Sequence, residues 1–322
     1  MNAIELTNVV KRYGKTTPPR KKRVAGTPAV EALREVSFTV DRGEMFGLIG
    51  PDGAGKTTAI RAMCGLLHVD SGSIRILGKD PAKQHRDLTA SIGYLSQRFS
   101  LYGDLSIDEN IAFFAQIHGV HDYHARRDRL LEMTQLTRFR GRLADQLSGG
   151  MKQKLALACT LVHEPQVILL DEPTTGVDPV SRREFWKLLS QFLASGITIL
   201  MSTPYLDEAE RCARIALLHE GQVLALDQPG RLRSSLGGAV FEVVVPQPRA
   251  AQDLLAAMPE VAGVQVFGDR LHVWMQVDDG PGAERRLHQI ALNAAIGDTQ
   301  VRRIVPSLED VFISKVANRT PS

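Results

Sequence analysis

The chain has 322 residues with a formal net charge of +3, and 23% of its residues are charged while 43% are apolar. This length allows one large domain and a small one with ample buried core, and so small a net charge gives no sign of a nucleic-acid partner. Three scattered cysteines, the lack of an apolar signal region and the lack of any run of about 18 apolar residues are expected of a cytoplasmic chain that does not itself span a bilayer.

Residues 1–47 predict a small antiparallel sheet that carries Tyr13. Residues 18–23, which contain four cations, form a loop longer than the usual turn between such strands. Two interpretations of this loop stay open. It could be a solvated loop, or it could contact anionic lipid headgroups, because a cytoplasmic leaflet attracts polybasic segments by about 1 kcal/mol per charge.

A phosphate-binding motif, G-x-x-x-x-G-K-[ST], follows the apolar strand at residues 44–50 and precedes the helical spacing of residues 58–64. Successive N–H groups at such a helix start converge on phosphates. Lys56 is predicted to reach the β- and γ-phosphates, and the Thr57 hydroxyl to ligate Mg²⁺. The residues predicted to bind the nucleotide here are Gly50, Pro51, Asp52, Gly53, Ala54, Gly55, Lys56, Thr57 and Thr58. The carboxylate of Asp52 has to point away from the phosphates.

Residues 91–95 predict another strand, and Gln97 follows it closely. Residues 98–146 lie between this strand and the next motif. Within this segment, Ser106 is followed three residues later by Glu109, which is the pattern of a capped helix start.

The sequence Leu-Ser-Gly-Gly-Met-Lys-Gln at residues 147–153 opens a further helix. Ser148 is suited to cap this helix. Gly149 and Gly150 leave its first N–H groups open to an anion.

The apolar run at residues 167–170 predicts a central strand of a parallel sheet that is covered on both faces. Asp171 and Glu172 follow at its carboxyl end, where open α/β sheets bind ligands. Asp171 is predicted to hold Mg²⁺ through its water shell, and Glu172 to orient the attacking water. Either acid alone could be a helix cap. The adjacent pair, downstream of a phosphate loop, favours catalysis.

Residues 197–201 predict a strand, and residues 202–209 predict the start of the next helix. Thr203 would cap this helix, and Pro204 suits its first turn. The acids at 207 and 208 would interact favourably with the helix dipole.

After residue 230 the pattern changes, and the order strand, helix, two strands, helix, strand predicts an α+β domain of the ferredoxin-like type over residues 231–322. The predicted elements are a strand at 241–245, a helix at 249–258, a hairpin at 263–275 that turns at Gly268 and Asp269, a helix at 283–295 and a strand at 300–305. We interpret His272 and Trp274 as packing residues.

With these motifs in this order, the chain resembles the nucleotide-binding subunit of an ATP-binding-cassette transporter over about residues 1–230. Residues 147–153 are similar to that family's signature sequence, Tyr13 stands where the family has an aromatic residue that stacks on adenine, and residues 176–178 are similar to the loop by which two subunits touch. The resemblance implies an α/β P-loop core with an antiparallel β subdomain and a mostly helical subdomain over about residues 98–146. It implies ATP and Mg²⁺ as ligands, with Gln97 among the catalytic and metal-binding residues.

The resemblance also implies partners. In the family, the signature residues, here Ser148, Gly149 and Gly150, bind the γ-phosphate of ATP held by the other subunit, so a second cassette is needed. Transmembrane permease subunits would supply the transport path, and the chain would lie peripherally on the cytoplasmic face of the inner membrane. The tail at residues 306–312 resembles drug-resistance-type ATPases, which work with exporters of the ABC-2 type. This predicts ATP-driven efflux of a drug, lipid or other small molecule.

Position 204 departs from the family, which usually has a histidine there that hydrogen-bonds phosphate. Pro204 cannot replace an imidazole, and the pattern resembles the first half of certain tandem two-cassette exporter ATPases. A heterodimer and a homodimer both stay open. Two other function classes also stay open: a soluble, non-transport cassette ATPase that acts on ribosomes or DNA, and a low-turnover regulatory nucleotide-binding module. A neighbouring permease gene and a turnover measurement discriminate between them.

Overall fold

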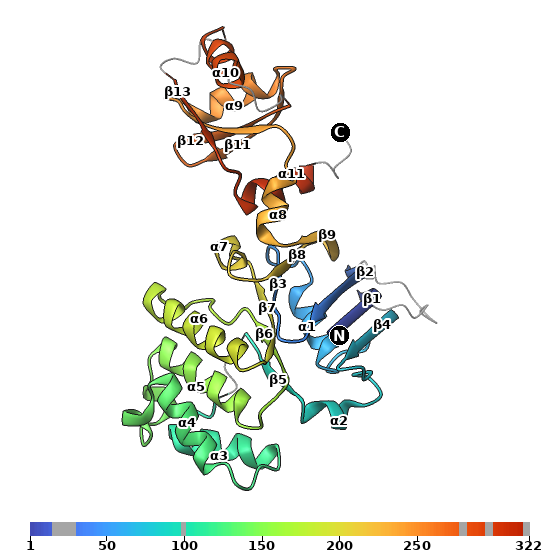
Figure 1. Ribbon diagram of the computed structural model, residues 1–322, viewed down its shortest axis with the longest axis vertical. Helices are drawn as coiled ribbons and strands as arrows, with labels where there is room; N and C mark the ends of the chain where they lie inside the picture. The colour runs from blue at the N-terminus through green and yellow to red at the C-terminus, as the bar shows by residue number, and fades with distance from the viewer. Residues whose placement is uncertain (15–29, 98–100, 277–281, 294–298, 318–322) are drawn as a thin grey trace, which may run out of the picture. The chain divides into compact units, whose positions relative to one another are not determined.

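The computed structural model describes residues 1–14, 30–97, 101–276, 282–293 and 299–317, and the chain divides into two compact units, Met1–Leu226 and Asp227–Ser322 (Figure 1). The predicted basic loop at 18–23 lies outside the described residues. Within the described ranges, no helix is long and apolar enough to cross a membrane.

The first unit is built around a six-stranded sheet with the order β5-β6-β7-β3-β8-β9. Its strands are β3 (Met45–Ile49), β5 (Ile92–Leu95), β6 (Val167–Asp171), β7 (Thr198–Thr203), β8 (Arg214–His219) and β9 (Gln222–Asp227). All residues of β3, β6 and β7 are buried, and the neighbours among β5, β6, β7, β3 and β8 pair in parallel. The continuous apolar run of β6 therefore does lie in a sheet covered on both faces.

A second sheet of the first unit is antiparallel, with the order β2-β1-β4. It consists of β1 (Asn2–Tyr13), β2 (Val30–Asp41) and β4 (Ser71–Ile76). The antiparallel pairing of β1, which ends at Tyr13, was predicted. The third strand of this sheet, β4, was not predicted. Residues 45–47 were predicted to belong to this antiparallel sheet, but they are part of β3 in the central sheet.

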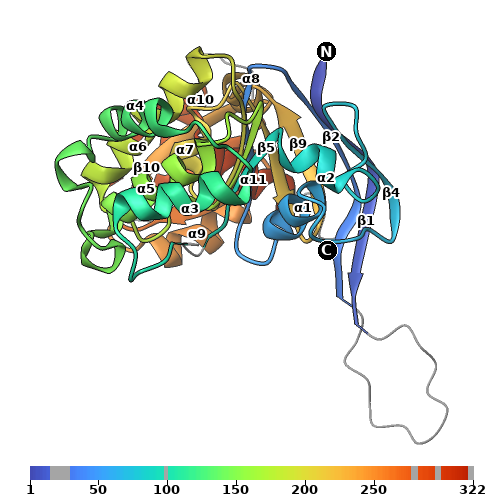
Figure 2. The same cartoon turned by 90° about the horizontal axis from the view of Figure 1, so that it is seen from below.

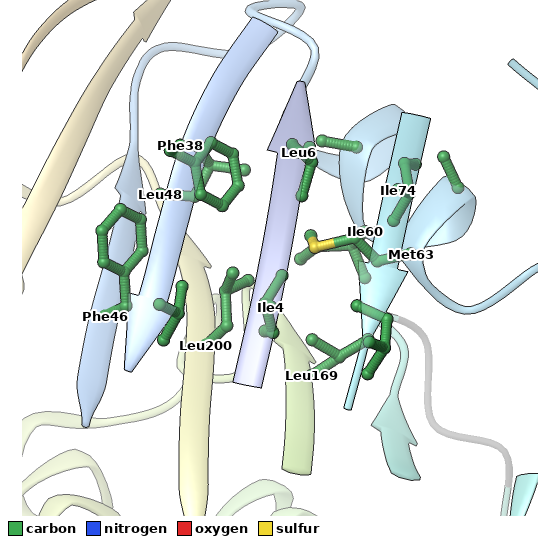
Figure 3. Close-up of a cluster of buried hydrophobic side chains, with 14 of the residues drawn as sticks. Ile4, Leu6, Phe38, Phe46, Leu48, Ile60, Met63, Ile74, Leu169 and Leu200 are labelled. Atoms are coloured by element: carbon green, nitrogen blue, oxygen red, sulfur yellow. The ribbon is translucent and has the colours of Figure 1, made fainter. Parts of the chain in front are cut away.

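Helix α1 (Lys56–Met63) lies between the two sheets. Both views show it on the side of the central sheet away from the helices α3 (Ile107–Ile117), α4 (His124–Thr134), α5 (Gly149–Leu161) and α6 (Pro179–Ala194) (Figures 1 and 2). Ile60 and Met63 of this helix are fully buried against Ile4 of β1 and Leu169 of β6 (Figure 3). This shared core fixes the helix start, and with it the phosphate motif, at the carboxyl end of β3.

The other helices of the first unit are α2 (His85–Thr89) and α7 (Leu206–Ala209), with 3₁₀ turns at Thr137–Phe139 and Ala144–Gln146. The predicted helix start at Ser106 is confirmed. The Ser106 hydroxyl accepts from the Glu109 N–H at 3.3 Å, and the Glu109 carboxylate accepts from the Ser106 N–H at 2.8 Å.

The predicted helix start at 202–209 is wrong in its boundary. Ser202 and Thr203 are the last residues of β7, and α7 begins only at Leu206 with Tyr205 at its N-cap position. Pro204 therefore precedes the helix rather than filling its first turn. The Thr203 hydroxyl accepts from the Tyr205 N–H at 3.1 Å, so it stabilises a turn and not the helix end.

The second unit has a four-stranded sheet with the order β11-β12-β10-β13, in which neighbouring strands pair antiparallel. Its elements are α8 (Pro229–Ser234), β10 (Ala239–Val244), α9 (Pro248–Ala256), β11 (Val261–Phe267), β12 (Arg270–Met275), α10 (Gly282–Asn293), β13 (Gln300–Ile304) and α11 (Leu308–Ala317). The hairpin turns at Gly268 and Asp269 as predicted. The core includes Phe241, Leu255 and Leu271.

Ser106→Ala should lower the free energy of unfolding of the first unit by about 1 kcal/mol, because the Glu109 N–H at the start of α3 loses its acceptor. The measurement is urea unfolding followed by the fluorescence of Trp186 in a Trp274→Phe background, which reports on the first unit alone. Ser106→Thr keeps a hydroxyl and serves as the control. Equal midpoints for the alanine and threonine variants would show that the cap contributes nothing.

Candidate functional site

The predicted phosphate loop surrounds a cavity of about 140 Å³, which is lined by residues 53–58 together with Ala32 and Glu172. Gly55 has a φ of 106°, and a Cβ there would lie 2.4 Å from the carbonyl oxygen of Ala32. Only glycine fits this close approach. Helix α1 starts at the next residue, so its free N–H groups face the site where an anion is favoured.

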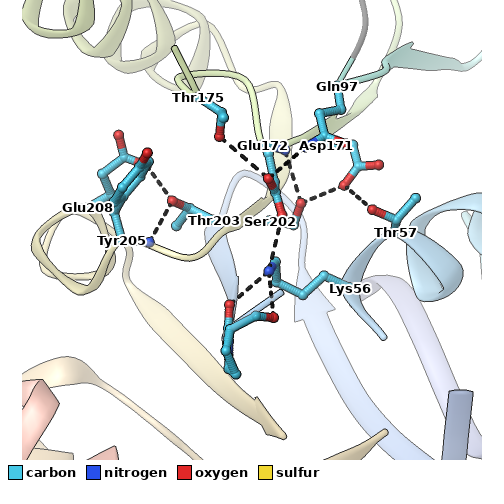
Figure 4. A network of polar contacts seen from close by, with 12 residues as sticks. Lys56, Thr57, Gln97, Asp171, Glu172, Thr175, Ser202, Thr203, Tyr205 and Glu208 are labelled. Carbon is cyan, nitrogen blue, oxygen red and sulfur yellow. Dashed lines mark hydrogen bonds and ion pairs between the residues drawn. The ribbon is translucent and has the colours of Figure 1, made fainter. Parts of the chain in front are cut away.

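Lys56 is buried at 3% exposure and its ammonium group has three partners (Figure 4). It donates to the carbonyl oxygens of Gly50 at 2.7 Å and Pro51 at 3.0 Å, and it forms an ion pair with Glu172 at 3.1 Å. The lysine thus bridges the phosphate loop and the carboxylate that follows β6.

Glu172 has a φ of 47°, which is the left-handed region that residues with a side chain seldom adopt. Its N–H donates to the Ser202 hydroxyl at 3.0 Å, which holds this conformation. Its carboxylate accepts from Gln97 at 3.0 Å and from Thr175 at 3.4 Å. The structure therefore brings Gln97 into direct hydrogen-bond contact with the Glu172 carboxylate.

Asp171 shares one carboxylate oxygen between two hydroxyl donors, Ser202 at 2.7 Å and Thr57 at 3.1 Å. Burial raises the pKa of Asp171 above its ordinary value. The two hydrogen bonds lower the pKa, but they have the smaller effect. The second oxygen, Oδ2, is buried and has no hydrogen-bond partner in the described structure. A free carboxylate oxygen beside a threonine hydroxyl is a set of oxygen ligands that suits Mg²⁺.

Tyr13 lies close to the other end of the loop. Its hydroxyl is 3.5 Å from the Thr58 hydroxyl, and the residue is 42% exposed. An exposed ring beside the phosphate loop is available for stacking on a base.

The signature residues stand apart from this cluster, because no hydrogen bond or ion pair among the described residues joins them to the phosphate loop. Ser148 caps α5 as predicted and accepts from the Met151 N–H at 3.3 Å. Ser148 and Gly149 are exposed. Gly150 is buried, and a Cβ there would lie 2.2 Å from the Ser181 hydroxyl of α6. The lack of a side chain at Gly150 thus also lets α5 and α6 pack closely, and the predicted binding of an anion by the N–H groups of Gly149 and Gly150 stays a prediction.

A larger cavity of about 440 Å³ opens at the amino ends of β6 and β7, lined among others by Arg126, Phe192 and Thr198. It shares no residue with the phosphate loop. The chemistry therefore belongs to the smaller cavity at the carboxyl ends of the strands, where the polar groups converge.

This fold and loop define a P-loop nucleotide-binding protein. The family model described as "ABC transporter" matches residues 33–175. The probable multidrug ABC transporter ATP-binding protein YbhF of Escherichia coli strain K12 is 41% identical over 300 residues, which are 91% of this chain and 50% of that protein. The Nod factor export ATP-binding protein I of Paraburkholderia xenovorans is 37% identical over 315 residues, which are 97% of this chain and 96% of that protein.

Among solved structures, the ATP-binding subunit of an ABC transporter is 31% identical, with a TM-score of 0.62, and the match covers 72% of this chain and 92% of that one. The chain belongs to the ATP-binding cassette transporter family. It spans half the length of the Escherichia coli relative that it matches.

The sequence analysis missed Ser202, Thr175 and Arg182, and it interpreted Thr203 and Glu208 only as residues of a helix start. No local motif marks the contacts of Ser202 and Arg182, since their partners come from other elements. One signal was available: a serine that directly follows an apolar run, as Ser202 follows residues 199–201, is buried and needs partners.

Ser202→Ala should lower the free energy of unfolding of the first unit by about 1 to 3 kcal/mol, because Asp171 loses a buried donor. The Glu172 N–H loses the hydroxyl but keeps the Ser202 carbonyl oxygen, 3.2 Å away, as an acceptor. Urea unfolding followed at Trp186, again with Trp274→Phe, measures it. Ser190→Ala is the control, since that hydroxyl only donates to a carbonyl within its own helix. If both alanine variants unfold at the same midpoint, Ser202 does not support the carboxylates.

Proposed function

We propose that the chain is an ATP-binding and ATP-hydrolysing subunit that powers a membrane exporter. The observation that carries this proposal is the convergence of Lys56, Asp171 and Glu172 on the phosphate loop, at the carboxyl ends of β3 and β6. The names of the relatives, a multidrug transporter subunit and a Nod factor export subunit, support export as the process that is driven.

Each residue of the cluster has a role that follows from its contacts. The N–H groups of residues 53–58 and Lys56 bind the phosphates. Glu172 orients the attacking water, and Gln97, which is already hydrogen-bonded to its carboxylate, helps to place it. Tyr13 stacks on the adenine.

Thr57 and Asp171, with Gln97 nearby, would hold Mg²⁺. When bound, this ion neutralises phosphate charge. The residues fit the ion because the buried Oδ2 of Asp171 lacks a partner among the described residues, and because oxygen is the ligand type that Mg²⁺ prefers.

We further propose that a second cassette completes the site. Ser148 and Gly149 are exposed at the start of α5, where helix N–H groups and the dipole favour an anion. They do not contact the phosphate loop of their own chain, which supports binding to ATP on a partner. ATP would then stabilise the closed pair by linkage.

The exporter would be of the ABC-2 type and would carry a drug, lipid or other small molecule, with permease subunits as the partners of this chain at the cytoplasmic face of the inner membrane. We propose residues 1–230 as the ATP-binding domain and residues 231–322 as an accessory domain. The order β-α-β-β-α-β with the sheet order β11-β12-β10-β13 supports a ferredoxin-like fold for the latter.

Lys56→Ala should abolish tight ATP binding, whereas Glu172→Gln should keep it and trap an ATP-loaded closed dimer. The reason is that Lys56 neutralises phosphate charge in the ground state, while Glu172 acts on the attacking water. Equilibrium ATP binding, phosphate release and sedimentation of the purified chain measure these effects. Parental hydrolysis by Glu172→Gln would overturn the assignment of the base.

Pro204→His should raise ATP turnover modestly in a homodimeric preparation, because an imidazole donor near the γ-phosphate acts most where charge rearranges in the transition state. One such donor contributes at best about 2 to 4 kcal/mol, and less if the turn shifts when the fixed φ of proline is lost. Phosphate release at saturating ATP is the measurement, and Pro204→Ala controls for the loss of proline. Turnover equal to that of Pro204→Ala would show that the absent histidine does not limit the rate.

A further inference from the structure

The residues on both sides of Pro204 hold this segment in place through their contacts with one another and with other elements. We call residues 203–208 the Pro204 loop. Proline supplies no N–H and no polar side chain, so the loop depends on its neighbours for hydrogen bonds. Thr203 carries most of them: its carbonyl oxygen accepts from the Gly50 N–H at 3.4 Å, and its hydroxyl donates to Glu208 at 2.7 Å.

Glu208 is a buried carboxylate, exposed by only 1%. Its Oε2 accepts from Thr203, but its Oε1 has no hydrogen-bond partner among the described residues. A buried charge of this kind is unfavourable unless a cation lies close to it. In the described part of the chain, Arg182 of α6 is the one cation within 4 Å of that carboxylate, with its Nε 3.7 Å from Oε1.

Arg182 also contacts two other residues of the Pro204 loop, Tyr205 and Asp207. Its guanidinium lies 4.8 Å from the centre of the Tyr205 ring, and it lies 3.8 Å from the carboxylate of Asp207. A planar guanidinium can stack on an aromatic ring and face a carboxylate at the same time, which a lysine cannot. Three residues of one loop thus share a single side chain from another element.

The position of Arg182 on α6 is equally well defined. Asp178 caps α6 by accepting from the N–H groups of Val180 and Ser181 at 3.0 Å each, and the Arg182 N–H donates to the Asp178 carbonyl at 2.9 Å. Residues 176–178 directly precede the helix. Ser181, the neighbour of Arg182, packs against Gly150 at the start of α5.

We propose that Arg182 is a positioning residue that fixes the Pro204 loop, and through Thr203 the first residue of the phosphate loop, to the first turn of α6. The first turn of α6 then joins three parts of the site: the signature helix through Ser181, the loop at 176–178 through Asp178, and the Pro204 loop through Arg182. This inference rests on the proposed ATPase function, because Arg182 would act by placing the Pro204 loop and the phosphate loop correctly around the γ-phosphate.

The test compares Arg182→Ala with Arg183→Ala in the full chain. Arg183 lies next to Arg182 on α6, is exposed, and donates to the Pro179 carbonyl within its own helix. We expect Arg182→Ala to lower kcat roughly tenfold or more, because small misplacements of supporting groups have effects of that size, and to leave the Kd for ATP within about twofold. Arg183→Ala should match the parental chain in both.

Two further variants separate positioning from simple destabilisation. Arg182→Lys keeps the charge but not the planar stack, and should restore only part of kcat. Glu208→Gln should lower kcat as well, and its combination with Arg182→Ala should lower kcat by less than the product of the two single effects. A kcat equal to that of the parental chain in well-folded Arg182→Ala, or a loss fully explained by the unfolded fraction in urea titration, would overturn the proposal.

The test also distinguishes this inference from the proposed function. If the parental chain binds ATP but does not hydrolyse it, the proposed function fails, and the Pro204 loop is then judged by the rate of chymotryptic cleavage after Tyr205. Faster cleavage in Arg182→Ala than in Arg183→Ala would support the positioning role. Equal cleavage rates would refute it.

Discussion

Two opposite charges are buried side by side at the centre of the first unit, and the arrangement of the site depends on them. Lys56 and Glu172 are 3% and 7% exposed and lie 3.1 Å apart. Either charge alone would be strongly destabilising in this position, while an apolar pair would often be as stable as the ion pair. The free energy of unfolding therefore does not explain why this ion pair is present. The proposed binding of phosphates by Lys56 does explain it. A polyanion in the cavity of residues 53–58 competes with Glu172 for Lys56, so ATP entry would release the carboxylate to act on water.

The backbone at Glu172 is set by the register between two strands. Asp171 of β6 lies opposite Ser202 of β7, and the Ser202 hydroxyl both donates to Asp171 and accepts from the Glu172 N–H. A left-handed φ at a residue with a side chain costs about 1 to 3 kcal/mol and persists only where its surroundings determine it. A shift of one residue in the register would turn Ser202 to the other face of the sheet. The geometry of both carboxylates thus depends on the packing of the whole central sheet.

The parts of this molecule that the sequence predicts are those with local causes. The phosphate loop, the cap at Ser106 and the turn at Gly268 each depend on residues within a few positions. The pairing of Asp171 with Ser202 joins residues 31 positions apart, and no spacing rule foretells it. The boundary of α7 was mispredicted because Thr203 is the last residue of β7. Its carbonyl oxygen accepts from Gly50 and its hydroxyl donates to the Glu208 carboxylate, so it does not cap the start of the helix. The close packing of Gly150 against Ser181 likewise depends on how α5 and α6 meet, so no local pattern predicts it.

The Pro204 loop combines both kinds of cause. Proline removes the local donor at position 204, and contacts from distant residues fix the loop instead: Gly50 through a backbone hydrogen bond and Arg182 through Glu208. A loop held in this way offers a shaped wall to the phosphates but no side-chain donor from residue 204. In the proposed function, the donors for the transition state would then come from Lys56, from the N–H groups at the start of α1, and from the exposed start of α5 in the proposed second cassette. Hydrolysis in this chain should accordingly depend on its partner more strongly than in a cassette with a histidine at this position.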